Sequence, residues 1–591
     1  MRSSLNVLPI TDDYMIMNLE DLIVLFLDCQ TTGANPQKGN VIEIGWARSD
    51  TFLCGEKPTR GMETYFVKPP CEQMIPKHIQ AVTGICQDKI ASGISAGDVW
   101  QKLVTTVEDI AQLDNMETCP VIIHYAKFEE PFLRDLHEHH GSRRDFPLNI
   151  ICTHEIARRL FPALPRRGIR ALAGYYGYSV QEQRRCCDHI AATAVIWREL
   201  IKSLKEEYTV NTFEQLVKWL KEMPIHVHFY RAYPMGARER RYLPDKPGVY
   251  RMLRSNGDVL YVGKATSIRK RVNSYFRKRV RHAEHILEML SQAKKLDITE
   301  TGSALEAAIL ESDEIKQYAP AYNIALKKRQ RGIWFCTANF KEWNTTPSTT
   351  YTRGPFARKI PVQQLAAIKD MIKISVGKPA EDDLYAAFGI PQDYAPGVEC
   401  VNQGFELFWK QHARILRDVP ALYALNKLGK ELWLKRTTEQ EGEIDADDNE
   451  ENETRGRVWR PETVAAMIEA NVLKSTHELR RTRWLVWLTE SSIAWEEVDN
   501  SSTRRTLLIF ENGEVVHRED LVSANDIPAP PGYQKRFNER QYNIDLMTLD
   551  RMRVVMSEMR KLVSSENWVR VRFSPEIMMD SDKLVRMLKW I

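Results

Sequence analysis

The order of apolar and polar residues predicts a small α+β domain in the middle of the chain. Two apolar runs, 248–253 and 259–262, flank Ser255-Asn256-Gly257-Asp258, and an Asn-Gly pair between such runs is the strongest short-range signal for a β-hairpin. After Thr266-Ser267, which can cap a helix, apolar residues recur at helical spacing. A second helix is predicted from Ser303 through Ile315.

Strands and helices alternate in the N-terminal third. The apolar runs Ile23 to Leu27, Val41 to Gly45 and Val121 to His124 are typical of buried strands, and a helix is predicted from Arg184 to Leu200. This alternation predicts an α/β layer fold. Asp28 ends the first strand, where a carboxylate faces the ligand edge of such a sheet.

The remaining chain is predicted to be mixed helix and sheet. Helices are expected from Phe213 to Met223, from Val362 to Ile372 and from Leu546 to Leu562. Trp484 to Leu488 and Leu507 to Phe510, the latter followed by Asn512-Gly513, are expected to form a hairpin sheet. No catalytic constellation is found there, and the tryptophans of this region, Trp459, Trp484 and Trp495, are assigned to buried core rather than to stacking on bases.

Local clusters of charged residues say more about function than the net charge of the whole chain does. The 591 residues have a net charge of +4, but the segment 264–281 contains eight Lys or Arg and no acidic residue. Such a segment can neutralise phosphates, although a solvated basic helix face is the other interpretation. The predicted nucleic-acid-binding residues are Arg269, Lys270, Arg277, Lys278, Arg279 and Arg281.

The segment 439–453 has nine acidic residues and no basic one. It is expected to be a flexible tether, with an acidic mimic of DNA as the alternative. The ten cysteines form no metal-type pairs, and no apolar run is long enough to span a membrane. We therefore expect reduced thiols, a cytoplasmic protein and no membrane partner.

Candidate chemistry gathers in the central domain. One carboxylate such as Glu311 is an adequate Mg²⁺ ligand, because this ion keeps most of its waters. Such an ion would offset the charge on the leaving oxygen of a phosphodiester. Tyr250 or Tyr261 could act as a general base for water if a cation such as Lys264 lowered its pKa from near 10. Arg271 can bind phosphate oxygens with its guanidinium fork.

These residues carry a resemblance to a known family. Pro247-Gly248-Val249-Tyr250, Leu260 to Ala265, Arg269 to Val272 and Ser274-Tyr275-Phe276 closely resemble the GIY-YIG nuclease domain of UvrC-type excision endonucleases, as do Ser303 to Glu311 and Pro320 to Asn323. The resemblance implies a metal-dependent nick in a DNA strand. It implies a pocket lined by Tyr250, Tyr261, Lys264, Arg271 and Tyr275, with Glu311 on the divalent metal and Asn323 supporting the site.

The N-terminal segment resembles the DnaQ-like (DEDD) 3′–5′ exonucleases in Leu27-Asp28, Thr31 to Gly33, Thr83 to Ile85 and His124 to Glu129. That family uses four carboxylates on two metal ions and a histidine that activates water. This chain keeps Asp28 but has Gln30 where Glu is normal and Glu129 where Asp is normal. Alignment of the last motif puts Gln183 at the histidine and Asp188 on the metal. In another register His189 is the base and that Asp is lost.

Gln30 removes one negative charge, and Gln183 cannot take up a proton. We therefore expect a weakened exonuclease domain that binds or positions DNA, with an active exonuclease left open. The helix-hairpin-helix modules and second nuclease domain of complete UvrC enzymes are not recognised in this sequence.

The predicted fold class is a multidomain α/β and α+β chain. Its parts are an RNase H-like DnaQ-type domain (20–204), a basic helical linker (205–243), a GIY-YIG domain (244–328), a helical accessory region (329–437), an acidic linker (438–456) and a C-terminal α+β domain (457–591).

The predicted function is Mg²⁺- or Mn²⁺-dependent nicking of DNA in repair, such as nucleotide excision repair, with DNA and repair or replication proteins as partners. Two alternatives stay open. One is an active 3′–5′ exonuclease with an accessory GIY-YIG domain, and the other is a non-catalytic DNA-binding scaffold.

Overall fold

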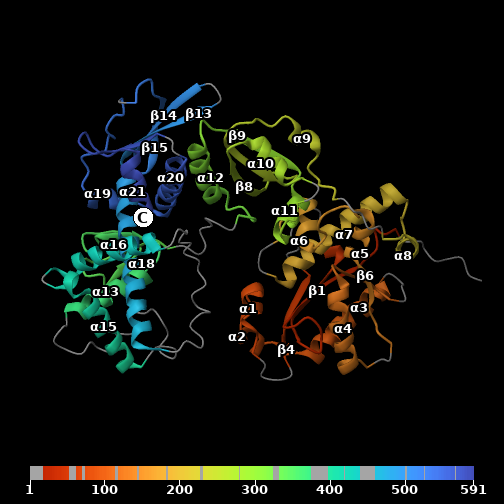
Figure 1. Cartoon of the computed structure of the whole chain (residues 1–591). Coiled ribbons are helices and arrows are strands. Elements are labelled where there is room, and N and C mark those ends of the chain that lie inside the picture. Colours follow the sequence, from red (N-terminus) through yellow and green to blue (C-terminus); the bar gives the residue numbers. More distant parts are fainter. Residues whose placement is uncertain are drawn as a thin grey trace, which may run out of the picture. The chain divides into compact units, whose positions relative to one another are not determined.

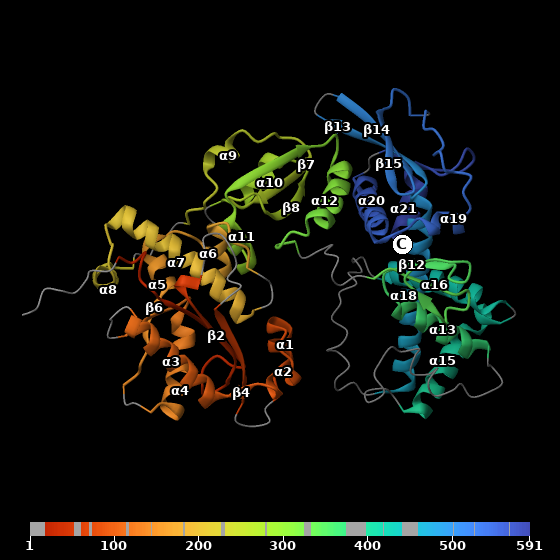
Figure 2. The ribbon, with the colours of Figure 1, turned by 180° about the vertical axis from the view of Figure 1, so that it is seen from behind.

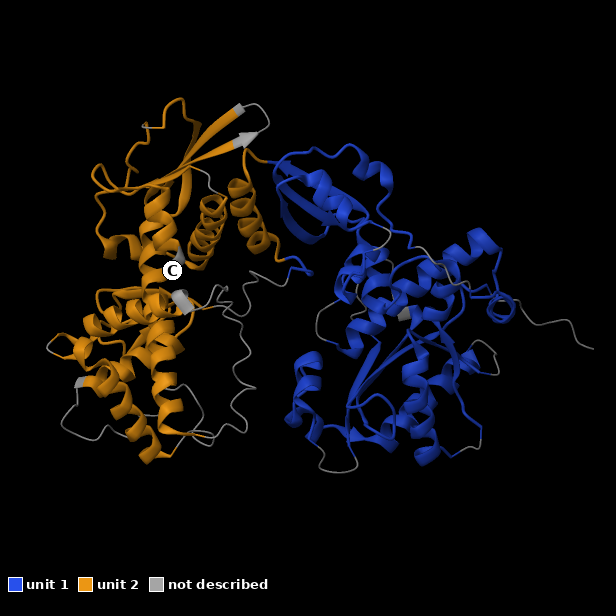
Figure 3. Cartoon of the chain, in the orientation of Figure 1, with its two compact units in different colours: residues 1–300, 320–323 blue, residues 301–319, 324–591 orange. Residues whose placement is uncertain are grey.

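A computed structural model describes residues 18–51, 61–69, 74–113, 118–142, 145–180, 184–225, 231–277, 280–323, 332–373, 397–417, 419–439, 459–499, 502–524, 526–565 and 568–590. Two compact units are distinguished in Figure 3. The first comprises residues 1–300 and 320–323, and the second comprises residues 301–319 and 324–591. The predicted 244–328 domain is thus divided between the two units.

The first unit begins with a six-stranded sheet in the order β4-β3-β2-β1-β5-β6. β1 (Leu25–Thr31) pairs antiparallel with β2 (Val41–Arg48) and parallel with β5 (Pro120–Ile123). The other elements of this domain, visible in Figure 1, are η1 (Ser49–Thr51), β3 (Met62–Lys68), α1 (Lys77–Thr83), α2 (Gln87–Ala91), β4 (Ile94–Ser95), α3 (Ala96–Leu113), α4 (Ala126–His140), β6 (Asn149–Cys152), α5 (Thr153–Leu160), α6 (Ile169–Tyr175) and α7 (Cys186–Tyr208). This confirms the predicted α/β layer fold.

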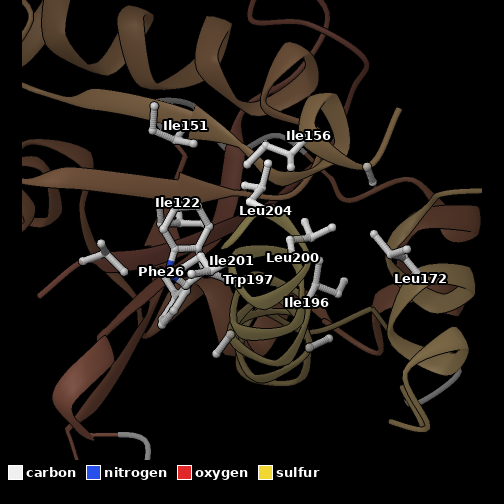
Figure 4. Packing of buried hydrophobic residues seen from close by; sticks show 14 of the residues in the cluster. Phe26, Ile122, Ile151, Ile156, Leu172, Ile196, Trp197, Leu200, Ile201 and Leu204 are labelled. Atoms are coloured by element: carbon white, nitrogen blue, oxygen red, sulfur yellow. The ribbon is translucent and has the colours of Figure 1, made fainter. Parts of the chain in front are cut away.

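Alternation along β1 decides which side chains face the site. Successive residues of a strand point to opposite faces. Leu25, Leu27 and Cys29 pack in the cluster that includes residues of α3 and α4. Phe26 packs in the cluster formed with α7, which contains Ile122, Trp197, Leu200 and Leu204 (Figure 4). Asp28 and Gln30 are two and four residues after Phe26 on the strand, so their side chains point to the same α7 side of the sheet.

The second domain of the first unit is a three-stranded antiparallel sheet in the order β8-β7-β9. The predicted hairpin is confirmed, with Gly257 at φ +95° in the turn, a conformation that glycine adopts without strain. Its helices begin close to the predicted positions. The elements are α9 (Ala237–Arg241), β7 (Gly248–Leu253), β8 (Val259–Ala265), α10 (Ile268–Ser274), α11 (Glu284–Gln292) and β9 (Lys295–Glu300). The preceding helix α8 (Phe213–Glu222) packs in the core of the first domain, in the cluster that includes α7.

The two domains of the first unit are packed together through polar contacts. Ser291 of α11 accepts the backbone N–H of Arg166 at 2.9 Å, and Asn256 of the hairpin turn donates to the carbonyl of Gly177 at 2.8 Å. Lys294 lies 3.9 Å from the centre of the Tyr175 ring. The exonuclease-type domain and the hairpin domain therefore contact each other directly within one folded unit and are not joined by a linker alone.

The second unit combines α12 (Ala304–Tyr318), a helical layer and a five-stranded sheet in the order β15-β14-β13-β16-β17. α12 and α20 (Leu546–Ser564) lie side by side in both views (Figures 1 and 2). The remaining elements are β10 (Trp334–Cys336), β11 (Trp343–Asn344), β12 (Arg353–Phe356), α13 (Ile360–Lys373), α15 (Val398–Leu416), α16 (Ala421–Glu439), α18 (Pro461–Leu488), β13 (Ser491–Asp499), β14 (Ser502–Glu511), β15 (Glu514–Asp520), α19 (Phe537–Tyr542), β16 (Val569–Arg572), β17 (Met578–Met579) and α21 (Ser581–Trp590).

One predicted strand of this unit is wrong. Trp484 to Leu488 forms the last turns of the long helix α18, and the sheet begins only at Ser491. A short apolar run cannot distinguish a strand from a buried helix end, because both are apolar on every side. The hairpin of β14 and β15 at Asn512-Gly513 and the helix α20 are confirmed. Trp484 and Trp495 are buried, as predicted, whereas Trp459 is only partly buried.

In the described part of the chain, none of the helices has the length and apolar character needed to cross a membrane. The cysteines described there carry free thiols. Most of the predicted acidic linker, residues 440–456, lies outside the described residues, as do Gln183, Lys278 and Arg279.

Candidate functional sites

A cluster of three tyrosines and one arginine forms in the hairpin domain. Tyr250 stands on β7, Tyr261 on β8, and Tyr275 follows α10, which carries Arg271. The Tyr250 and Tyr275 hydroxyls are hydrogen-bonded at 3.0 Å. The Tyr261 ring lies 6.1 Å from that of Tyr250 and 6.5 Å from that of Tyr275. The Arg271 guanidinium is 5.3 Å from the centre of the Tyr275 ring.

Local geometry explains why this cluster is compact. Gly263 lies opposite Tyr250 across the hairpin, and a Cβ there would come within 2.5 Å of the Tyr250 hydroxyl. Glycine is therefore needed for the phenol to lie flat against β8. Arg271 and Tyr275 are four residues apart, which brings them to one side of the helix.

Burial separates the roles of the tyrosines. Tyr250 is fully buried, and burial together with Tyr275 and Tyr261 raises its pKa well above the usual value, while Arg271 opposes this. Tyr261 is only partly buried. Tyr250 is therefore a phenol held in its neutral form, and Tyr261 is a more accessible phenol in the same cluster. The pKa of the Arg271 guanidinium is raised by its interaction with Tyr250.

Two further residues hold the cluster in place. The side-chain amide of Asn323 donates to the Val262 carbonyl at 2.8 Å and accepts the Val262 N–H at 2.9 Å. Asn323 thereby satisfies the backbone hydrogen-bonding groups of Val262 on the edge strand β8, between Tyr261 and Gly263. His282 stacks on Tyr275 at 6.0 Å and bonds its carbonyl at 2.7 Å. His282 is not among the residues predicted from the sequence, because it has no signal beyond its place after the basic segment.

The basic residues near this cluster differ in exposure and partners. Arg269 donates to the Leu243 carbonyl at 2.7 Å, and Lys270 is 4.0 Å from Asp245. Arg271, Arg277 and Arg281 are exposed, while Lys264 is partly buried on β8. Glu311, the expected metal ligand, is half-buried on α12 and belongs to the second unit. Its role as a ligand stays a prediction.

A second group of polar residues lies under α7 in the exonuclease-type domain. Asp28 is buried, and both of its oxygens accept hydrogen bonds: Oδ2 from the Gln30 amide at 2.8 Å, and Oδ1 with His189 Nδ1 at 3.0 Å. The ring nitrogen of His189 is also 3.4 Å from the Gln30 amide. Gln30 and His189 therefore each hydrogen-bond to Asp28, one to each carboxylate oxygen.

On α7 it is His189 that contacts Asp28, and the role of Asp188 as a metal ligand stays a prediction. The preceding residue Asp188 points about 100° away around the helix, and its charge acts on the Tyr178 phenol and the Cys187 thiol. The start of α7 is held by Glu43, which the sequence analysis placed only as a strand residue. Its carboxylate pairs with Arg185 at 2.6 Å and accepts the Cys186 N–H at 3.2 Å.

This group fits two metal ions poorly. Glu129 is buried, and burial and the neighbouring Asp28 raise its pKa well above the usual value, which favours the neutral acid. Gln30 and His189 direct nitrogen atoms at Asp28, so the oxygens that would bind a cation are already hydrogen-bonded. Among the described residues, no three His, Cys, Asp or Glu side chains are grouped to hold a metal.

His124, part of the exonuclease resemblance, has a structural role. Its Nδ1 is 2.9 Å from the Thr153 hydroxyl and its Nε2 is 3.0 Å from the Arg167 carbonyl. Burial lowers its pKa to about 3, so the ring is neutral and holds the start of α5 against the sheet.

Comparison with known proteins agrees with both domains. Residues 246–324 match the family model of the UvrC-like GIY-YIG domain, and residues 25–193 match that of an exonuclease family, RNase_T. The UvrABC system protein C of Clostridium perfringens is 47% identical over 87 residues, 15% of this chain and 14% of that protein. That of Idiomarina loihiensis is likewise 47% identical over 87 residues, with the same coverage. The match thus spans about one seventh of these relatives.

Solved structures are similar to the same segments. The GIY-YIG N-terminal endonuclease domain of UvrC from Thermotoga maritima, bound to magnesium, is 31% identical and is covered to 94% by 15% of this chain, with a TM-score of 0.14. The nuclease domain of 3′hExo, a DEDDh family member bound to rAMP, is 16% identical and is covered to 92% by 31% of this chain, with a TM-score of 0.24. The chain contains an exonuclease domain and a UvrC-like GIY-YIG domain, and it is a nuclease by its domain content.

Proposed function

We propose that this chain, which joins an exonuclease domain to a UvrC-like GIY-YIG domain, nicks a DNA strand in repair with Mg²⁺ or Mn²⁺. The observation that carries the proposal is the cluster of Tyr250, Tyr261, Tyr275 and Arg271 inside the matched segment 246–324. Three phenols and a guanidinium in van der Waals range of one another can hold a phosphodiester and a water. The similarity to UvrABC system protein C supports DNA repair as the process in which the chain acts, and repair proteins as its partners.

Two residues of the cluster, Tyr261 and Arg271, have defined roles in this proposal. Tyr261, the more accessible phenol, takes a proton from the attacking water, with Lys264 and Arg271 as the cations that favour its ionised form. Arg271 also binds the non-bridging oxygens of the phosphate as charge accumulates on them. Glu311 would hold the divalent ion, which when bound offsets negative charge on the leaving oxygen.

For the exonuclease domain we propose a weakened site that binds or positions DNA. The contacts of Gln30 and His189 with Asp28 support this, because both oxygens of this acid already accept hydrogen bonds. The alternative, an active 3′–5′ exonuclease, is supported by the family match and by the two buried acids Asp28 and Glu129 inside the matched segment.

Restoring carboxylates at this site should create exonuclease activity. The double variant Gln30→Glu with His189→Asp is expected to release label from 3′-end-labelled single strands in Mg²⁺ at least about tenfold faster than the wild type, because two added ligands strengthen metal binding. The same variant with Asp28→Ala is the control and should be inactive. If the wild type already degrades these strands and Asp28→Ala stops it, the alternative function is correct.

Salt dependence should reveal the DNA contacts of the basic segment. Replacing the exposed Arg277 and Arg281 by Gln is expected to reduce the slope of log K against log salt by about two, since each phosphate contact contributes about 0.9. The expected affinity loss is the same for any sequence. Arg134→Gln removes an exposed arginine of α4 that pairs with Glu130, and its slope should match the wild type. An unchanged slope in the double variant would exclude these two contacts.

A further inference from the structure

The helix α12 has two different faces. At about 100° per residue, Glu306, Asp313 and Lys316 lie on one side of the helix, together with the buried Leu305 and Ile309. Glu311 lies roughly opposite, on the other side. The ion-pairing side chains of α12, with Leu305 and Ile309, thus lie on the side of the helix opposite to the carboxylate proposed to hold the metal.

The first face is bound to the C-terminal sheet and to α20 by three ion pairs. Glu306 pairs with Arg518 of β15 at 2.6 Å, Asp313 with Arg551 of α20 at 3.1 Å, and Lys316 with Asp550 of α20 at 3.4 Å. Lys316 also donates to the Met547 carbonyl at 3.2 Å. The pairs are spaced over three turns, so they define both the rotation and the axial position of α12.

Burial makes these contacts specific. The side chains of Arg551, Lys316 and Asp550 are 4%, 3% and 2% exposed. Burial lowers the pKa of Lys316, and the opposite charge of Asp550 opposes this shift. A buried charge that loses its partner is strongly destabilised, so a shifted or rotated α12 would leave unpaired charges.

Apolar packing continues the same surface. Leu305 and Ile309 belong to the cluster that contains Phe510 of β14 and Met552 and Met556 of α20. The helix α12, which belongs to the matched GIY-YIG segment, therefore packs in the core of the C-terminal domain, against residues more than 200 positions away in sequence.

We propose that the C-terminal domain is the positioning platform of the nuclease, and that Arg551, Asp550 and Arg518 are positioning residues that set the orientation of Glu311 through α12. This inference rests on the proposed function, in which Glu311 holds the metal. It gives residues 491–590, which contain no catalytic constellation among the described residues, a role in the metal dependence of nicking.

Arg551 provides a matched test, because it binds two carboxylates. Asp313 lies on α12, whereas Glu514, bonded at 2.7 Å, lies on β15. Asp313→Asn and Glu514→Gln each take one carboxylate from the same guanidinium, but only the first loosens α12. We expect Asp313→Asn to raise the Mg²⁺ concentration for half-maximal plasmid nicking and to lower kcat, each by about five- to tenfold, with an unchanged KM for DNA.

Glu514→Gln should stay within about twofold of the wild type in both quantities. Thermal melting of both full-length variants checks that stability does not explain the difference. Equal Mg²⁺ dependence in the two variants would overturn the platform.

A second pair guards against a folding defect in Asp313→Asn. Arg518→Gln removes the contact with Glu306 of α12, while Arg504→Gln removes a contact with Asp520 of β15 at 2.9 Å. All of these side chains except Glu306 are substantially exposed. The Mg²⁺ requirement should rise in Arg518→Gln and not in Arg504→Gln; identical behaviour contradicts the proposal.

If Glu311→Gln still nicks, the proposed function fails; if it is inactive while Asp313→Asn equals the wild type, only the platform fails.

Discussion

Replacing Glu311 by Gln is expected to abolish nicking of supercoiled plasmid, a loss of about 10³-fold or more, while DNA binding changes little. The amide has the size of the carboxylate but no charge, so it cannot hold a divalent cation against the phosphate. Binding of DNA depends on the basic residues of the hairpin domain and should persist. The measurement pairs a plasmid-relaxation assay in Mg²⁺ and Mn²⁺ with a binding titration at the same salt concentration.

Glu300→Gln is the matched control for this result. Glu300 is an exposed carboxylate at the end of β9 that pairs with Lys246 at 2.8 Å, and its loss should leave nicking within about twofold of the wild type. Full nicking by Glu311→Gln would remove the metal assignment. An inactive wild type that binds DNA in a salt-dependent way would instead support the scaffold alternative.

The second large effect is expected from Tyr261→Phe, which should lower kcat for nicking by about 10²- to 10⁴-fold, the usual contribution of a general base. Tyr250→Phe should cost only about tenfold. The difference follows from burial: the Tyr250 hydroxyl is committed to Tyr275 at 3.0 Å, and burial raises its pKa well above the usual value, so it resists ionisation.

The pH dependence of the two variants separates these roles. A phenol must lose its proton to act as a base, so the rate of the wild type and of Tyr250→Phe should rise with pH. The rate of Tyr261→Phe should lose this rise. The assignment of the base would be reversed if Tyr250→Phe were the variant with the flat profile and the larger loss.

Local signals in the sequence were sufficient for the hairpin domain. Asn256-Gly257 between two apolar runs specifies the turn, whereas the pairing of Tyr250 with Gly263 also depends on a register shift between Met252 and Leu253. Helical spacing then brings Arg271 beside Tyr275. These features depend on residues close in sequence, so their prediction needs no knowledge of the rest of the fold.

Features that depend on distant contacts were not accessible in this way. Glu43 of β2 holds the start of α7, and His189 of that helix contacts Asp28 across 161 positions. The end of α18 resembled a strand because its apolar residues are enclosed by tertiary packing on all sides.

The sequence by itself determined the two nuclease domains, the tyrosine and arginine residues of the GIY-YIG motif and the neutral substitution at Gln30. Only the tertiary structure decided how buried each phenol is, which residue of α7 meets Asp28 and which domain holds α12. The reason is that burial and ion pairing arise between segments far apart in the chain, and spacing along one segment contains no information about the partner that will cover it.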